Sequence, residues 1–232
     1  MKLLAFVLLL LLVPFSVIAG ELGTLSEKYE SSHRGPGTVS TGEGDPGGVS
    51  YGSYQLASKA GRADEFVKKY YPTEFAGLKG GTLEFTAKWK ELAAKDPKAL
   101  HANEHAFIKE THYDPQVAKL RKDLGLDVTK RSAALRDVVW STAVHHGPNT
   151  DVIVVAVKPL LTKDPITNIT DEAIIRAVYA ERGRKTPDGK LARFKLVSDS
   201  WIPGLSKRFV NEERDALEML KAETPVPVKP AP

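Results

Sequence analysis

SAALRDVVWSTAVHHGP, residues 132–148, is the part of the sequence that says most about the fold. Ser132 is a favourable N-cap, and Gly147-Pro148 is a common helix terminator. Between them the only charged or ionisable residues are Arg136, Asp137 and two histidines, and the rest are Ala, Leu, Val and Trp with the small Ser141 and Thr142. A helix that is apolar on every side belongs inside a protein. The pattern therefore predicts a central helix over 133–146 in a mainly helical core.

Start signals predict further helices around this one. A Thr or Asp cap, followed in two cases by proline at the first helical position, precedes each of the segments 83–94, 98–109, 116–124 and 171–182. Thr24 and Glu27 form a capping box that opens a short helix ending near Ser32. Residues 151–158 are also predicted as a helix, although their β-branched side chains would suit a buried strand. A last helix is expected over 206–222.

Residues 29–56, YESSHRGPGTVSTGEGDPGGVSYGSYQL, differ in kind from these helices. They hold seven of the protein's 18 glycines, and two β-prone pieces, 38–40 and 49–51, flank Gly-Glu-Gly-Asp-Pro-Gly-Gly. This predicts a hairpin or small irregular sheet. The fold class expected is therefore mainly α (α+β), with a small glycine-rich β element.

The two ends of the chain differ from the middle. Met1-Lys2, an apolar run to Ile18 and a small residue at Ala19 are typical of a secretory signal peptide. We therefore expect a signal over 1–19, one catalytic domain over 20–222 and a disordered proline-rich tail over 223–232. The expected location is secreted or periplasmic, without stable membrane insertion after cleavage, since every later apolar run is interrupted by charge.

Composition excludes some chemistries. The chain has no cysteine, which excludes thiolate nucleophiles and cysteine metal sites. Its formal charge is +4, and a basic exported protein suits an anionic polymer such as peptidoglycan, nucleic acid or a membrane surface. Lys and Arg are scattered without interleaved aromatics, so specific nucleic-acid binding is not expected.

The glycine-rich segment carries three carboxylates. Glu30 is expected in the last turn of the first helix, where the dipole disfavours an ionised carboxylate by about 0.3–1 kcal/mol. A carboxyl kept protonated could donate a proton to a leaving oxygen, as a glycosidase acid does. Asp45 or Glu43, on a solvated turn, could be the ionised partner. A plain loop and a calcium-binding turn through Glu43 and Asp45 remain alternatives.

Other side chains are candidates for substrate binding or metal binding. Tyr51 and Tyr54 could stack on sugar rings, Gln55 could hydrogen-bond an amide, and His146 could line the cleft instead of only complementing a helix end. His101, Glu104 and His105 spell the inverted zinc-protease pattern, for which Glu181 would be a third ligand. That pattern also arises by chance, and we expect no metal and no cofactor.

Ordered motifs through nearly the whole chain resemble a known family. They are Glu30-Ser31, residues 35–40 (GPGTVS), 44–52 (GDPGGVSYG), Tyr54-Gln55, 111–115 (THYDP), 132–135 (SAAL), 137–144 (DVVWSTAV), 146–148 (HGP), 181–183 (ERG) and Arg208-Phe209. They are similar to the lysozyme-like, chitosanase-related domain found at the C terminus of type VI secretion spike proteins and in phage lytic proteins. In such a fold a helix ending in Glu-Ser is followed by a glycine-rich β element, and Tyr54-Gln55 opens the next helix.

The resemblance implies a lysozyme-like fold that cleaves peptidoglycan between amino sugars without a cofactor. Glu30 would be the acid, Asp45 the second carboxylate and Glu43 the reserve. Where two glycines are expected after Glu30-Ser31, this chain has Ser32-His33. A bulkier pair beside the acid leaves a second hypothesis, a non-catalytic peptidoglycan-binding protein with the same fold. The linkage cut, and whether by muramidase, glucosaminidase or lytic transglycosylase chemistry, is not fixed by these residues.

Overall fold

The computed structural model describes residues 22–26, 28–29, 35–43, 47–194 and 197–223. Within them the fold is mainly helical with one two-stranded sheet, which confirms the predicted class. The α-helices are α1 (Thr24–Ser26), α2 (Arg62–Tyr70), α3 (Leu83–Lys95), α4 (Pro97–Ile108), α5 (Asp114–Leu124), α6 (Ala133–His146), α7 (Val152–Val157), α8 (Asp171–Arg182) and α9 (Ile202–Glu223). Shorter turns are the π-helix η2 (Lys109–Tyr113) and the 3₁₀ turns η3 (Val128–Lys130), η4 (Leu160–Thr162) and η5 (Asp199–Trp201).

Helix α6 lies at the centre of the core, as predicted. Leu135, Val138, Val139 and Trp140 are fully buried, and α6 contacts α1, α5, η2, α7, α8 and α9. Ser132 caps it by accepting from Leu135 N at 3.1 Å, and Gly147 ends it with a φ of 89°. An apolar surface on all sides is thus matched by neighbours on all sides.

Three other predicted caps are also present. Thr82 accepts from Phe85 N at 3.2 Å, Asp96 from Ala99 N at 2.9 Å, and Thr170 from Ala173 N at 3.2 Å. Residues 152–157 are helical, as expected. Helix α9 begins earlier than predicted, at Ile202, because Pro203 stands in its first turn, where a missing N–H costs nothing.

The predicted start of a separate helix at Asp114-Pro115 is wrong. Helices α4 and α5 are joined without a break through η2, and Asp114 is itself helical (φ −60°, ψ −41°). Its N–H donates to Lys109 O, five residues back, and its carboxylate pairs with Lys109 Nζ instead of capping. The wider turn lies where an α-helix would press the Thr111 carbonyl against the ring of Pro115.

The glycine-rich segment forms the predicted small sheet. Val39 bridges Tyr51, and β1 (Ser50–Tyr51) pairs antiparallel with β2 (Leu56–Ala57). The expectation that Tyr54-Gln55 opens a helix is wrong, because the chain turns there into β2. The next helix, α2, starts only at Arg62 and was not predicted, since Gly61 precedes it without a side-chain cap.

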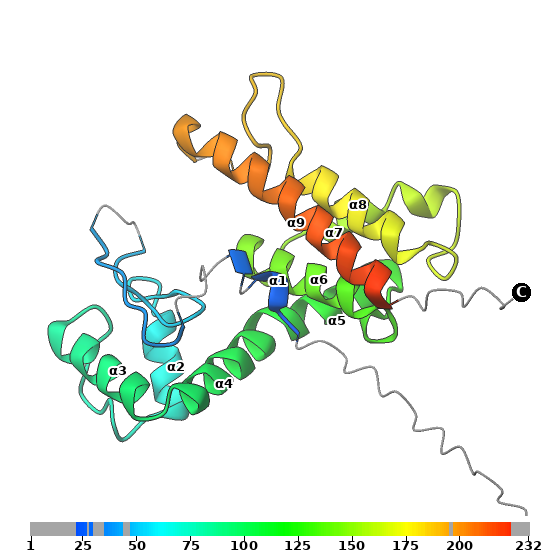
Figure 1. Cartoon of the computed structure of the whole chain (residues 1–232). Helices are drawn as coiled ribbons and strands as arrows, with labels where there is room; N and C mark the ends of the chain where they lie inside the picture. Colours follow the sequence, from blue (N-terminus) through cyan, green and yellow to red (C-terminus); the bar gives the residue numbers. More distant parts are fainter. Residues whose placement is uncertain (1–21, 27, 30–34, 44–46, 195–196, 224–232) are drawn as a thin grey trace, which may run out of the picture.

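Figure 1 shows how these elements are arranged. The small sheet, α2 and α3 lie at one end of the α4–α5 helix, and α6 to α9 gather at the other end, with α1 against α6. Trp89 Nε1 of α3 donates to Pro36 O at 2.8 Å, and this hydrogen bond attaches the glycine-rich segment to α3. The chain therefore builds two groups of elements joined by one long helix.

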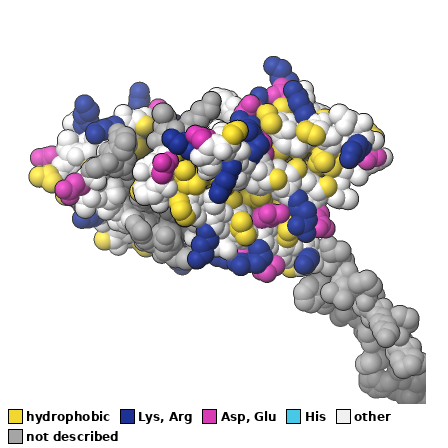
Figure 2. All heavy atoms as spheres, turned by 90° about the horizontal axis from the view of Figure 1, so that it is seen from above, with side chains coloured by type: hydrophobic (Ala, Val, Ile, Leu, Met, Phe, Trp, Pro, Cys, Tyr) yellow, Lys and Arg dark blue, Asp and Glu magenta, His cyan; other side chains and the backbone are white. Residues whose placement is uncertain are grey.

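The ends of the chain are described only in part. The predicted signal over 1–19 and the tail from 224 lie outside the described residues. Glu223, expected as the first tail residue, is instead the last residue of α9, and its carboxylate accepts from Ala133 N and Ala134 N, both at 2.7 Å. Among the described helices, none has the length and apolar character needed to cross a membrane. On the face shown in Figure 2, Lys and Arg are interspersed with Asp and Glu.

Candidate functional site

The structure describes one of the three candidate carboxylates. Glu43 is exposed on the glycine-rich loop, where its N–H donates to Thr41 Oγ1 at 3.4 Å. Glu30 and Asp45 lie outside the described residues, as do Ser32 and His33. The described residues on either side of them define the surroundings of the candidate site.

Helix α1, which leads to Glu30, is fixed by a side chain far away in sequence. Asp137 of α6 accepts from Thr24 Oγ1 and Leu25 N, both at 2.7 Å, and from Gly23 N. Burial raises the pKa of Asp137, although these hydrogen bonds oppose the shift. The Asp137 carboxylate therefore caps this helix from α6, whereas the predicted capping box with Glu27 lies outside the described residues.

Lys28 and Tyr29, directly before Glu30, are attached to α9. The Tyr29 hydroxyl donates to Asp215 Oδ2 at 2.6 Å, and Lys28 Nζ pairs with the same oxygen. The Arg208 guanidinium lies 5.8 Å from the centre of the Tyr29 ring. Burial and the Asp215 carboxylate raise the pKa of Tyr29, so its hydroxyl stays a donor. The chain is held in place up to the residue that precedes the candidate acid.

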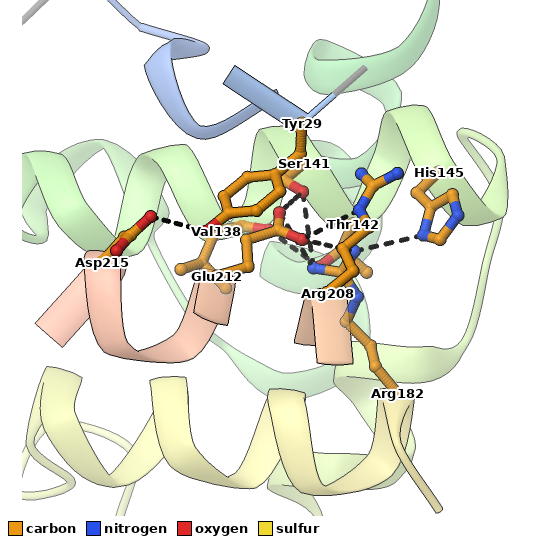
Figure 3. A network of polar contacts seen from close by, with 9 residues as sticks. All are labelled: Tyr29, Val138, Ser141, Thr142, His145, Arg182, Arg208, Glu212 and Asp215. Carbon is orange, nitrogen blue, oxygen red and sulfur yellow. Dashed lines mark hydrogen bonds and ion pairs between the residues drawn. The ribbon is translucent and has the colours of Figure 1, made fainter. Parts of the chain in front are cut away.

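Beneath Tyr29 a buried polar network joins α6, α8 and α9 (Figure 3). Arg182 Nη2 lies 3.3 Å from Glu212 Oε2, and both side chains are fully buried. Ser141 Oγ donates to Glu212, and Arg208 Nε approaches it at 3.4 Å. Arg182 also donates to His145 Nδ1 at 3.2 Å, and burial, with the nearby arginines, strongly lowers the pKa of His145. This ionic cluster sets the position of α9, which holds Tyr29.

Sequence reasoning assigned no role to Arg182, Glu212 or Asp137. A signal was present: each is a charged residue on a helix face that is otherwise buried, and such charges need a partner. The partner itself could not be named, since Asp137 and Leu25 are 112 residues apart.

On the other side of the site, Tyr51 and Tyr54 have structural contacts. The Tyr51 ring is fully buried against Phe85 and Trp89, and its hydroxyl contacts Thr86 Oγ1 at 2.8 Å. Tyr54 is 8% exposed and packs on Trp140. Sugar stacking needs an open ring face, and the structure gives Tyr51 none. We therefore do not retain Tyr51 as a stacking residue.

Gln55 is half-buried at the end of the same turn. Its Nε2 donates to Gly52 O at 2.8 Å, and it has a φ of 51°, the one positive value among described residues other than glycine. Non-glycine residues in this region are strained by about 1–3 kcal/mol and are common at functional sites. Gln55 therefore remains a candidate for substrate binding.

Three residues of α4 lie against this turn. Ser53 N donates to Glu104 Oε2 at 3.0 Å, Ser53 Oγ contacts His101 Nδ1 at 3.1 Å, and the Tyr54 hydroxyl contacts His105 Nδ1 at 2.9 Å. Burial raises the pKa of Glu104 to about 8. The three residues of the HxxEH pattern, His101, Glu104 and His105, thus all contact the glycine-rich segment at Ser53 or Tyr54.

The zinc alternative finds no support in the described residues, which contain no group of three His, Cys, Asp or Glu able to hold a metal ion. Glu181, its expected third ligand, pairs with Arg184 at 2.7 Å and with Arg193 at 2.5 Å.

His146 lies apart from the glycine-rich turn. Its ring packs on Phe194, at 4.9 Å between centroids, and on Phe209 of α9. Burial lowers its pKa to about 3, so the ring is neutral at pH 7. It contacts none of Tyr51, Tyr54 or Gln55 in the structure, and a cleft-lining role for it stays a prediction.

A groove of about 600 Å³ borders the loop that carries Glu43. Its walls include Gly42, Gly48, Gly80 and Gly81, together with Lys59 and Lys79. Both lysines are exposed, and neither forms an ion pair with a described carboxylate. Free ammonium groups at the groove favour an anionic ligand.

Comparison with known proteins shows which family this chain resembles. The family "Type VI secretion system spike protein VgrG3-like, C-terminal" matches residues 22–213. The type VI secretion system spike protein VgrG3 of Vibrio cholerae serotype O1 is 39% identical over 202 residues. That match covers 85% of this chain and 19% of the relative, so the chain spans about a fifth of the relative's length. The family match includes Glu30, Glu43, Asp45 and the network around Glu212.

Proposed function

Because the chain belongs to the family of VgrG3-like C-terminal domains of type VI secretion system spike proteins, we propose that it is a glycosidase that cleaves the glycan strands of peptidoglycan. Glu30 is the general acid, and Asp45 is the ionised carboxylate that activates water or stabilises the developing oxocarbenium ion, with Glu43 as its substitute. The sequence resemblance to a lysozyme-like, chitosanase-related domain supports these assignments. The two carboxylates suffice for this chemistry without a cofactor.

The observation that carries the proposal is the attachment of Tyr29. A general acid acts efficiently only when it is held at a fixed position relative to the bond that it protonates. The Tyr29 hydroxyl is hydrogen-bonded to Asp215, and the Arg208 guanidinium lies against the Tyr29 ring; both of these residues belong to α9. The buried Arg182–Glu212 pair in turn fixes α9 against α6 and α8. A linker would not need such anchoring up to the residue before Glu30.

The groove beside Glu43 supports peptidoglycan as the substrate. Peptidoglycan carries carboxylates on its lactyl groups and peptide stems, whereas chitosan carries amines. Lys59 and Lys79 at the groove favour the anionic polymer of the two.

The export route belongs to the same proposal. Residues 1–19 are proposed as a signal peptide and residues 20–222 as the catalytic domain, which would act in the periplasm or after secretion. The basic charge of the chain fits this anionic target.

Turnover of isolated sacculi tests the proposal. The purified chain without residues 1–19 is expected to release soluble muropeptides, and Glu30→Gln is expected to release none. Asp45→Asn is expected to lose most activity and Glu43→Gln little. Glu74→Gln, which changes an exposed glutamate on the turn after α2, is the matched control and should keep full activity.

The outcomes separate the two hypotheses. Equal release by wild type and Glu30→Gln would remove Glu30 from the mechanism. Binding of sacculi without release by either protein would identify a cell-wall binding domain that lacks turnover. Mass spectrometry of the released fragments assigns the cleaved linkage and distinguishes hydrolysis from anhydro-ring formation.

A further inference from the structure

The fully buried Glu104 is not used by the proposed chemistry. Its Oε2 accepts from Ser53 N at 3.0 Å, while its Oε1 has no hydrogen-bond partner among the described residues. A buried polar atom without a partner is costly, so a carboxyl group at this position needs a reason. Burial also raises its pKa to about 8, so that it is mostly neutral at pH 7.

Gly52 shows how closely the carboxyl approaches the backbone. A Cβ added to Gly52 would lie 1.8 Å from Glu104 Oε1, and Gly52 has a φ of 75°. Gly52 N donates to Thr38 O at 2.8 Å, and Gly52 O accepts from Gln55 Nε2. Glu104 therefore lies directly against Gly52. Through its backbone hydrogen bonds, Gly52 contacts both Thr38 and the Gln55 side chain.

The histidines on either side of Glu104 hold the next two residues of the turn. His101 contacts Ser53 Oγ, and His105 contacts the Tyr54 hydroxyl while stacking on Trp140 at 4.6 Å between ring centroids. One face of α4 thus contacts Gly52, Ser53 and Tyr54 in succession. The residue that follows is the strained Gln55.

This arrangement leaves one group of Gln55 available to a ligand. Its Nε2 is bonded to Gly52 O, whereas no described residue donates to its Oε1. An amide oxygen that is fixed by its own amide nitrogen is a good acceptor for the N–H of an acetamido group, which every N-acetylated amino sugar carries.

We propose that Glu104, with His101 and His105, is a positioning residue that holds the Gly52–Gln55 turn so that Gln55 Oε1 accepts from the acetamido N–H of the glycan. The inference rests on the proposed function for the substrate class. It gives the HxxEH pattern a task other than metal binding, namely selection of N-acetylated over de-N-acetylated sugars.

Binding measured without turnover tests the inference. In a Glu30→Gln background, isothermal titration compares an N-acetylglucosamine tetramer with its de-N-acetylated counterpart. Gln55→Ala is expected to weaken the acetylated ligand about tenfold, which equals ~1.4 kcal/mol, and to affect the other ligand little. Glu104→Ala is expected to lower the same preference by a similar factor, and Glu104→Gln to restore it. Glu110→Ala, an exposed change on the adjoining π turn, is the control.

Coupling of the two positions gives the decisive readout. If Glu104 acts through Gln55, the double variant loses no more preference than Gln55→Ala alone. The inference would be overturned if the losses of acetyl preference in the two single variants multiplied in the double variant. It would also be overturned if Glu104→Ala weakened binding of both ligands equally. This outcome is independent of the proposed function, whose failure shows instead as sacculus turnover that survives Glu30→Gln.

If Glu104→Ala does not fold, the pH profile of Glu104→Gln carries the test. The titratable groups around Glu104 are His101, His105, Tyr54 and Tyr71, all of which the variant keeps. The acetyl preference of wild type is expected to fall above pH 8 as Glu104 ionises, and that of Glu104→Gln to stay level. Identical profiles would overturn the inference.

Discussion

Replacing Arg182 by methionine should destabilise the fold more than any change of an exposed charge. The guanidinium and Glu212 are both fully buried, and Nη2 lies 3.3 Å from Glu212 Oε2. Methionine keeps much of the side-chain volume but removes the positive charge. Glu212 would then be left in the interior with only Ser141 and Arg208 as partners.

The size of the expected loss of stability follows from the burial of the Glu212 carboxylate. Removing one partner of a buried pair costs about 3–5 kcal/mol, because the remaining charge loses its buried counter-ion and here keeps only the partly exposed Arg208. In a domain of this length each kcal/mol lowers Tm by about 2–4 °C, so a fall of roughly 6–20 °C is expected. The double variant Arg182→Met/Glu212→Gln removes both charges and should recover at least half of the loss.

Urea denaturation followed by circular dichroism measures the change. Arg176→Met is the matched control, since Arg176 lies on the same helix in an exposed i,i+4 pair with Glu172, worth about 0.3–0.5 kcal/mol. Losses of the same size for Arg182→Met and Arg176→Met would refute the reasoning. So would a double variant that is less stable than Arg182→Met.

Three other predictions concern the glycine-rich half. Gly52→Ala should lower the free energy of unfolding by about 1–3 kcal/mol more than Gly61→Ala, because both glycines have positive φ but only Gly52 lies against Glu104. Equal losses of stability for the two variants in urea denaturation would contradict this. The pKa of Glu104, raised by burial from 4.5 to about 8, means that wild type loses stability as pH rises through that window while Glu104→Gln does not. Urea titrations at pH 5 and 9 should therefore show a growing advantage for Glu104→Gln, and a constant difference would count against it. Lys59→Gln/Lys79→Gln should weaken retention on sacculi at low salt and lose this effect near 0.5 M salt, where exposed charges are screened; a difference that survives high salt would rule out a charge effect.

Features encoded by neighbouring residues could be predicted from the sequence. Ser132 and Thr170 cap the helices that follow them, because a cap needs only a side chain and an N–H three residues on. The all-round apolar pattern of 133–146 also identified the central helix. The class of fold followed from these local signals.

Contacts between distant residues could not be predicted in this way. Asp137 caps α1 from a different helix, and Glu212 pairs with Arg182, which is 30 residues away in the sequence. Tyr51 was a candidate for stacking on a sugar ring, yet the fold buries its ring against Phe85 and Trp89 of α3. For the candidate acid the sequence motif remains the guide, since Glu30 lies outside the described residues.

The unbroken run from α4 through η2 to α5 also limits how the chain can vary. It is a rod of about 40 Å, and each residue added to a helix rotates everything beyond it by about 100°. A one-residue insertion in the rod would therefore turn the sheet, α2 and α3 away from α6 to α9, whereas the same insertion in a surface loop would be absorbed locally. Length changes between relatives of this chain should accordingly fall outside residues 97–124.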